Sequence, residues 1–372
     1  MKNTELSGTK LKALAGVCLS SLMFGLEISS VPVILPAIKN TLHANFTDLQ
    51  WIMNAYTIAC TAVLMGIGAL SDRFGRKLIF LISVVSFGIS SFACGVAQNV
   101  AVLISFRAVQ GMSGGAMLIC QVSTLSNLFP DGKERAKAFS YWGIIFGVGL
   151  GFGPVIGGGI LAVSSWEWVF LIHVLISFIT FHLIYLGIGE IRKPTEKSFD
   201  YIGMFSLTFS VFFITYFITQ SSGEEMRATA LIPLLLAVVC LLVFLFAEKK
   251  AADPVIDFSV FRVPAFTGAV LGSIGMNISF WPFMIYLPIY FQNALGYDST
   301  FTGLALLAYS LPPLFLPPLA EKLSLRYSAG RVIPFTLLTI GAGFFLMWLG
   351  NRSPHAGWLT LLPGLITAGA GL

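Results

Sequence analysis

The chain has 372 residues, of which 56% are hydrophobic and 10% are charged, whereas about 25% of the residues are charged in a typical soluble domain. This composition excludes a water-soluble globular protein and makes lipid the main solvent. The net charge of +5 follows from the basic loops described below, and it indicates neither a nucleic-acid partner nor an acidic one.

Apolar runs long enough to cross a bilayer recur along the chain. A hydrocarbon core about 30 Å thick requires about 20 apolar residues per helix, and backbone polar groups must be satisfied inside the lipid. Uninterrupted apolar runs exclude the alternating pattern of a membrane barrel, so we predict an all-α, polytopic transmembrane bundle. The twelve predicted spans are 11–35, 49–70, 78–97, 100–128, 138–163, 169–189, 202–219, 230–247, 266–291, 301–320, 332–349 and 358–372.

Basic residues gather in alternate loops. Cytoplasmic loops carry the excess of Lys and Arg, and most of the 22 basic residues lie on the side of the N-terminus. The outer loops hold only Lys39, Arg227 and Arg352, and Arg107 is the single basic residue inside a predicted span. We therefore predict a multi-pass protein of the bacterial inner membrane with a cytoplasmic N-terminus. The five cysteines all fall in apolar spans and predict neither a disulfide framework nor a metal site.

The first predicted span contains Glu27, the only acidic residue that lies deep in a span. It precedes Pro36 by nine residues, which at 1.5 Å per residue places it roughly 13 Å below the outer end of the helix. A carboxyl group at this depth can load and release protons. The alternative is a static buried pair that holds two helices together.

The loop between the second and third spans reads GALSDRFGRK, residues 68–77. Glycine at position 75 permits a tight turn, and the adjacent charges of Asp72 and Arg73 can dock on a helix end. A basic cytoplasmic turn would explain Arg76 and Lys77 but not the whole string. The string resembles the loop signature of the major facilitator superfamily. This resemblance implies a conformational gating role for Gly68, Asp72, Arg73, Gly75 and Arg76.

The fourth predicted span carries RAVQGMSGG, residues 107–115, which is similar to the second signature of the superfamily and includes Gln110 and Gly111. A charge at this depth costs at least ~2.5 kcal/mol on insertion scales and is a functional-site hypothesis by default. Arg107 lies eight residues after Asn99, about 12 Å below the outer end, and is thus level with Glu27. We predict that the two side chains meet and form a proton-coupling pair. A structural arginine that snorkels to the surface is the alternative.

The fifth predicted span reads GIIFGVGLGFGPVIGGG, residues 143–159. Small residues four apart let helices cross closely in lipid, and a proline bends a helix. Glycine-rich packing alone is common in membranes, but the Gly153-Pro154 element looks like the antiporter signature of the superfamily, which marks exporters rather than uptake symporters. The residues assigned to this bending element are Gly149, Gly153, Pro154 and Gly157.

The segment WEWVF, residues 166–170, stands at the start of the sixth predicted span and is followed by His173. The exporter branch commonly shows Trp-Arg-Trp and a following Asn here, so Glu167 and His173 are departures. The tryptophans indicate an outer aromatic belt. Glu167 reverses a local charge near the exit and leaves the charge of the substrate open.

The predicted spans fall into three groups. The six before the charged linker at 190–200 resemble the first half of the superfamily, and the next two resemble the pair that the fourteen-helix drug:H⁺ antiporter branch inserts between its halves. The predicted domains are therefore 1–190, 191–262 and 263–372, the last with about four helices. We expect a chain that is truncated at its C-terminus. The alternative is a complete twelve-helix protein split six and six.

The resemblance implies a proton-coupled antiporter that exports amphipathic drugs or other small hydrophobic compounds and thereby confers antibiotic resistance. It implies a monomer in the lipid bilayer, with a small-molecule substrate, no enzymatic activity, no metal and no cofactor beyond the proton gradient. Aromatic residues of the ninth span could line the substrate cavity, although core or lipid-facing packing explains them equally well: Trp281, Tyr286 and Tyr290. An uptake symporter for a small nutrient and a non-transporting membrane sensor are the alternative functions, and the fifth-span signature weighs against the symporter.

Overall fold

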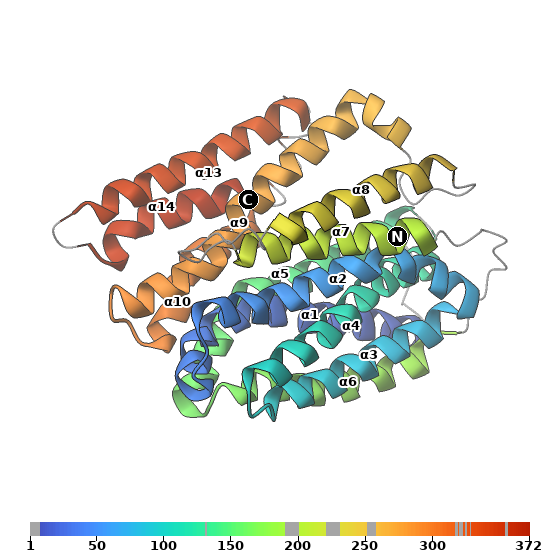
Figure 1. Cartoon of the computed structure of the whole chain (residues 1–372), viewed down its shortest axis with the longest axis horizontal. Helices are drawn as coiled ribbons and strands as arrows, with labels where there is room; N and C mark the ends of the chain where they lie inside the picture. Colours follow the sequence, from blue (N-terminus) through green and yellow to red (C-terminus); the bar gives the residue numbers. More distant parts are fainter. Residues whose placement is uncertain are drawn as a thin grey trace, which may run out of the picture. The chain divides into compact units, whose positions relative to one another are not determined.

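The computed structural model describes residues 8–130, 132–189, 201–220, 231–250, 258–316, 319, 323, 326–327, 329–353 and 356–372. Within these ranges the regular structure is helical and contains no strand, which confirms the predicted all-α class. The elements are α1 (Gly8–Leu42), α2 (Phe46–Phe74), α3 (Arg76–Gly95), α4 (Val100–Leu128), α5 (Gly132–Val163), α6 (Glu167–Gly187), α7 (Tyr201–Gln220), α8 (Leu231–Lys250), the 3₁₀ helix η2 (Phe258–Arg262), α9 (Pro264–Asn293), α10 (Ser299–Ser310), α11 (Pro312–Phe315), α13 (Ala329–Asn351) and α14 (Trp358–Gly371) (Figure 1).

Every predicted span coincides with a helix, but one of them is interrupted. The span predicted at 301–320 is not a single helix, because α10 ends at Ser310 and α11 begins at Pro312. Two consecutive prolines follow Leu311, so two backbone donors are missing from the ladder of helical hydrogen bonds. The prolines occupy the first positions of α11, where an N–H would have no intrahelical partner.

Short polar side chains cap three helices at the ends that were predicted to face outward. Asn45 accepts from the backbone of Asp48 and Asp48 accepts in return, both at 2.9 Å, which forms a capping box at the start of α2. Asn99 caps α4 and Asp298 caps α10 through side-chain oxygens that accept from the third residue of each helix. These caps satisfy amide groups that would otherwise have no partner near the lipid.

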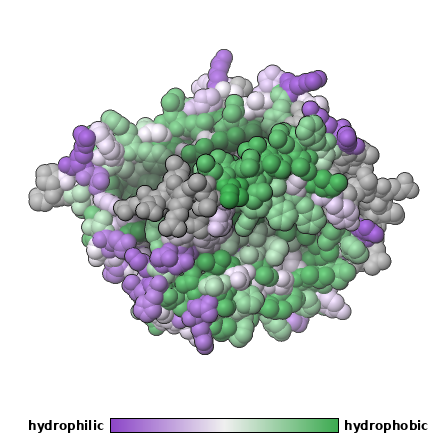
Figure 2. Space-filling model, viewed as in Figure 1, coloured by the Kyte–Doolittle hydropathy of each residue, from purple (hydrophilic) through white to green (hydrophobic). Residues whose placement is uncertain are grey.

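Among the described residues, nine helices are long and apolar enough to cross a membrane, namely α1, α3 to α9 and α13. Helix α14 is apolar but shorter, with 14 residues. Large apolar side chains are exposed along these helices, and Leu235 and Phe246 of α8 are each 65% exposed. Figure 2 shows apolar residues over much of one face, with hydrophilic residues mainly toward its edges. Such a surface is stable in hydrocarbon and not in water, so the chain is a multi-pass membrane protein.

The chain packs as two compact units, and the first contains the described residues of Met1–Phe24, Ile38–Gly143 and Phe170–Asp257. Within it, α4 packs against α2 and α3, and α7 packs against α8 and α2. The start of α1 lies against the end of α6, where the backbone of Ala13 approaches Gly187. Trp51 of α2 joins α7 through ring contacts with Phe212 and Tyr216.

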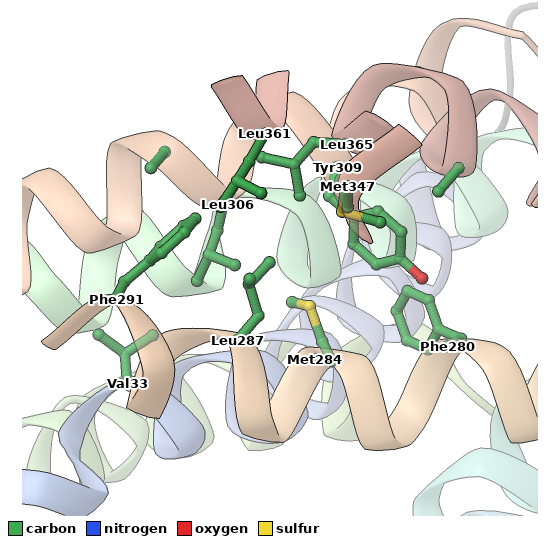
Figure 3. Close-up of a cluster of buried hydrophobic side chains, with 12 residues drawn as sticks. Val33, Phe280, Met284, Leu287, Phe291, Leu306, Tyr309, Met347, Leu361 and Leu365 are labelled. Atoms are coloured by element: carbon green, nitrogen blue, oxygen red, sulfur yellow. The ribbon is translucent and has the colours of Figure 1, made fainter. Parts of the chain in front are cut away.

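The second unit contains the described residues of Gly25–Ala37, Ile144–Val169 and Phe258–Leu372. Helices α13 and α14 run side by side in it (Figure 1), and α14 also packs against α10. A buried apolar cluster joins α9, α10, α13, α14 and Val33 of α1 (Figure 3). Tyr309 lies fully buried in this cluster and stacks on Phe280 at 5.9 Å between ring centroids.

Candidate functional site

Arg107 of α4 is the largest fully buried side chain of the described residues, and its charge is held inside the first unit. Its Nε donates a hydrogen bond to the backbone carbonyl of Ile52 at 3.0 Å, and its Nη1 donates to Oε1 of Gln110 at 2.6 Å. The guanidinium carbon lies 4.3 Å from the ring centroid of Tyr56 and 5.8 Å from that of Phe170. These contacts fix a positive charge in the interior of the unit, so the side chain does not snorkel to its surface.

Glycines on α4 create the space for Arg107. A methyl group at Gly111 would lie 2.1 Å from the carbonyl oxygen of Tyr56, and one at Gly115 would lie 2.6 Å from that of Cys60. Arg107, Gly111 and Gly115 follow one another at intervals of four residues and thus share the face of α4 that meets α2. Small residues let two helix backbones approach in lipid, and here the approach brings the guanidinium to the α2 backbone.

Gln110 connects Arg107 to α3. It is fully buried, and while its Oε1 accepts from Arg107, its Nε2 donates to Oγ of Ser91 at 2.8 Å. A buried amide with both ends bonded is a stable arrangement, whereas an unsatisfied one is costly. Arg107 is therefore held by α2 on one side and through Gln110 by α3 on the other.

Glu27 of α1 lies in the second unit and is also fully buried. The α1 residues next to it pack on the glycine run of α5, since Oγ of Ser29 lies 2.9 Å from the carbonyl of Gly25 and 3.2 Å from that of Gly149. Because Glu27 and Arg107 belong to different units, the contact between them stays a prediction.

Helix α5 presents small residues to two neighbours in the second unit. Toward α1, a methyl group at Gly153 would lie 1.9 Å from Oγ of Ser29, and one at Gly157 would lie 3.0 Å from the carbonyl of Ser30. Toward α10, the carbonyl of Pro154 would lie 2.5 Å from a methyl group at Gly303. The helix continues through Pro154. The predicted bending element is therefore enclosed between α1 and α10 with no room for larger side chains.

The string at 68–77 forms the end of α2, a one-residue junction and the start of α3. The junction is Gly75, whose φ of 103° and ψ of 132° suit glycine, and its N–H donates to the carbonyl of Ser71 at 3.1 Å. Nη1 of Arg76 lies 3.4 Å from the carbonyl of Ser123 on α4, and the guanidinium of Arg73 lies over the ring of Phe74. A methyl group at Gly68 would meet open space. The side chain of Asp72 lies outside the described residues, so its docking stays a prediction.

Two of the three aromatic candidates on α9 share a cavity in the second unit. A cavity of about 250 Å³ is lined by Tyr286 and Tyr290 together with Trp348 and Asn351 of α13. The hydroxyl of Tyr290 donates to Oδ1 of Asn351. Trp281 does not line this cavity, and its Nε1 donates to Oδ1 of Asn277 at 2.8 Å.

Gln121 is a buried polar residue of α4 that was not expected from the sequence. Its Nε2 donates to Oγ of Ser20 on α1, and its Oε1 accepts from Nε1 of Trp142 on α5, both at 2.9 Å. An amide inside an apolar span is itself a signal, because it must find partners within the protein. The tie between three helices makes Gln121 a structural counterpart of Gln110.

The family model described as Major Facilitator Superfamily matches residues 17–372. Similar proteins include the multidrug resistance protein Stp of Mycobacterium tuberculosis, 27% identical over 98% of this chain and 67% of the relative. The tetracenomycin C resistance and export protein of Streptomyces glaucescens is 30% identical over 92% of this chain and 64% of the relative. The drug efflux pump JefA of M. tuberculosis is 28% identical over 77% and 56%. The chain thus spans between 56% and 67% of the length of these three relatives.

Solved structures with the same fold include a D-xylose-proton symporter, with a TM-score of 0.66 and 14% identity over 97% of this chain and 79% of that protein. The peptide transporter POT in complex with sulfate has a TM-score of 0.69 and 15% identity over 97% and 80%. At these identities the likeness concerns the fold.

Proposed function

We propose that this chain, which belongs to the Major Facilitator Superfamily, is a proton-coupled antiporter that exports amphipathic drugs or other small hydrophobic compounds across the bacterial inner membrane. The observation that carries the proposal is the complete burial of two ionisable side chains, Glu27 and Arg107, in membrane helices. Such groups are costly in lipid and mark proton or substrate pathways. The names of the relatives, a multidrug resistance protein and drug-export proteins, suggest the class of substrate.

In the proposed mechanism, Glu27 carries the proton and Arg107 is its stationary partner. Two helices hold Arg107 through Ile52 and Gln110, so its charge stays in place while the charge of Glu27 changes. An anionic Glu27 is attracted to the guanidinium, and a protonated Glu27 is released from it. Proton loading would thereby change the attraction between α1 and α4, which links the proton gradient to helix movement.

The glycine run of α5 supplies the surface on which α1 could move. Gly149, Gly153 and Gly157 leave no side chains that interlock with α1, and Pro154 removes one backbone donor inside α5. The string Gly68, Asp72, Arg73, Gly75 and Arg76 would form the cytoplasmic gate. Trp281, Tyr286 and Tyr290 would offer aromatic surface to the substrate.

The remaining parts of the proposal concern topology. The N-terminus lies in the cytoplasm, and the segment 191–262 inserts α7 and α8 between a first half at 1–190 and a second half at 263–372. The protein works as a monomer and uses the proton gradient without a cofactor. The exposed basic end of α8, Lys249 and Lys250, agrees with the excess of positive charge expected on the cytoplasmic side.

The direct test is transport into everted membrane vesicles from cells that express this chain. Fluorescent amphipathic compounds with positive, neutral and negative charge are added, and accumulation is followed with a proton gradient and after its collapse by an uncoupler. We expect gradient-dependent accumulation of at least one compound, together with proton release from the vesicles.

The Glu27→Gln variant, matched for protein level, serves as the control for coupling. If a folded, membrane-inserted protein accumulates none of the compounds, the antiport proposal is contradicted. If protons and compound move in the same direction, the symporter alternative replaces it.

A further inference from the structure

A long apolar groove runs between α3, α4 and α6 in the first unit. One cavity of about 490 Å³ lies between these helices near Leu78 and Tyr185, and a second of about 470 Å³ continues along α3 and α6 toward Phe92. The two cavities share Val85, Ile89 and Phe181, so they form one continuous groove. Figure 1 shows α3 and α6 side by side, and Oγ of Ser177 on α6 donates to the carbonyl of Val84 on α3 at 2.7 Å.

The floor of the groove is a stripe of exposed apolar side chains on α3. Leu78, Ile82, Val85, Ile89 and Phe92 follow at intervals of three or four residues and thus lie on one face of the helix. The side chain of Ile89 is 62% exposed, and most of the residues that line the groove around it are apolar. The stripe covers fourteen residue steps, or about 21 Å at 1.5 Å per residue. This length exceeds half of the roughly 30 Å hydrocarbon core, which is the depth of one lipid leaflet.

A positive charge marks one end of the groove. Nζ of Lys77 donates to the carbonyl of Tyr185 at 2.8 Å and lies 4.8 Å from the centroid of the Tyr185 ring, which itself lines the groove. An ammonium group has three donors, so this contact leaves donors for a further acceptor. Helix α3 begins at Arg76, so the positive end of its dipole lies at the same end. No acidic side chain occurs among the described residues that line the two cavities.

We propose that this groove binds one anionic glycerophospholipid, with its phosphate at Lys77 and an acyl chain along the α3 stripe. The charge at one end and the largely apolar path beyond it match the two parts of such a lipid. Lys77 lies on the side predicted to be cytoplasmic, where basic pockets between membrane helices favour anionic headgroups. A second copy of the chain would not explain why the charge of Lys77 lies at one end of a largely apolar groove.

Photolabelling in nanodiscs tests the proposal. The whole chain is reconstituted in phosphatidylcholine that contains a small fraction of phosphatidylglycerol with a diazirine in its acyl chain, or of phosphatidylcholine with the same diazirine. Labelled peptides are identified by mass spectrometry. One basic residue contributes about 1 kcal/mol to anionic-lipid binding, which corresponds to roughly fivefold. We expect phosphatidylglycerol to label the groove peptides of α3 and α6 about fivefold more than phosphatidylcholine.

Matched variants separate the headgroup from the groove. Lys77→Gln should reduce labelling by phosphatidylglycerol to the level of phosphatidylcholine, Lys77→Arg should retain it, and Lys39→Gln on the exposed end of α1 should leave it unchanged. Val85→Trp fills the groove and should reduce labelling by both lipids, whereas Val243→Trp on the exposed face of α8 should not. Ile89→Trp replaces Val85→Trp if the latter elutes as an aggregate in size-exclusion chromatography.

Three results would overturn the proposal. The first is equal labelling of the α3 and α6 groove and the exposed faces of α7 and α8. The second is a preference for phosphatidylglycerol that persists in Lys77→Gln. The third is a dimer in native mass spectrometry whose contacts, mapped by cross-linking, cover the groove, because a second copy would then be the occupant.

Discussion

Helix α4 approaches α2 closely at Gly111, one turn from the buried Arg107. We therefore expect Gly111→Ala, which adds a single methyl group, to destabilise the protein. In the structure the new methyl would lie 2.1 Å from the carbonyl oxygen of Tyr56, whereas ordinary van der Waals contact begins near 3.4 Å. The obstructing atom belongs to the backbone of α2 and cannot rotate away. Helices α2 and α4 must therefore separate by more than about 1 Å.

The separation has two costs and one gain. Overpacking of this kind costs about 1–3 kcal/mol. A wider gap also stretches the 3.0 Å bond from Arg107 to the carbonyl of Ile52, and hydrogen bonds to charged groups contribute about 1.5–3 kcal/mol. Alanine favours the helix by about 1 kcal/mol relative to glycine. The expected result is a net loss of stability of about 1.5–5 kcal/mol.

Thermal stability in detergent measures this loss. The purified variant is heated and the fraction that elutes as a single peak in size-exclusion chromatography is recorded at each temperature. Gly159→Ala is the matched control. Gly159 also lies within a helix, α5, but a methyl group there would have no neighbouring atom within 4 Å. Gly111→Ala should lose its peak at a lower temperature than the wild type, and Gly159→Ala should not. If Gly111→Ala is as stable as Gly159→Ala, the close packing of α2 on α4 is not what holds Arg107.

Substitutions at three further positions test the polar residues. Glu27→Gln should abolish proton-coupled export and retain substrate binding, because an amide keeps the shape of the side chain but does not exchange a proton, whereas Glu27→Asp should be tolerated; undiminished gradient-driven efflux by the Gln variant would assign coupling to another residue. Arg107→Lys should impair transport and lower thermal stability by about 1–3 kcal/mol, since lysine lacks the planar donors that reach Ile52 and Gln110 together; wild-type behaviour in both assays would show that charge alone suffices. Gln121→Leu removes two interhelical bonds at ~0.6–1.7 kcal/mol each and should lower the midpoint of thermal unfolding without changing the proton dependence of transport, and a changed proton dependence would give Gln121 a part in coupling.

The helical architecture was predictable because lipid limits the choice. Each span must be helical and about 20 residues long, so hydrophobic length alone located the helices, including the nine among the described residues that are long enough to cross a membrane. The prediction of one continuous helix at 301–320 was wrong, because the sequence stays apolar beyond Leu311 but two prolines end α10 there. Hydropathy does not register a missing backbone donor, although the Pro-Pro pair itself was visible in the sequence.

The buried arginine was predictable as a site, but its contacts were not. A charge in an apolar span stands out in any sequence, and Gln110 lies one turn away on the same helix. The acceptor at Ile52 is a backbone carbonyl, which every residue possesses, and the position of Tyr56 depends on how α2 crosses α4. Gln121 was overlooked for a similar reason, since its partners lie on α1 and α5 and only packing brings them together.

The bonds around Arg107 on α4 and those of Ser29 on α1 differ in a way that suits the roles proposed for the two helices. Arg107 is bonded to the carbonyl of Ile52 on α2, and Gln110 beside it is bonded to Ser91 on α3, so a displacement of α4 from either helix breaks a bond. Ser29 has a single hydroxyl proton and two carbonyls within reach, Gly25 on its own helix at 2.9 Å and Gly149 on α5 at 3.2 Å. When α1 shifts along the glycines of α5, this hydroxyl can exchange one carbonyl for the other and remain bonded. The bonds of α4 therefore resist movement, while the contact of α1 with α5 tolerates it, as a fixed charge and a moving proton carrier require.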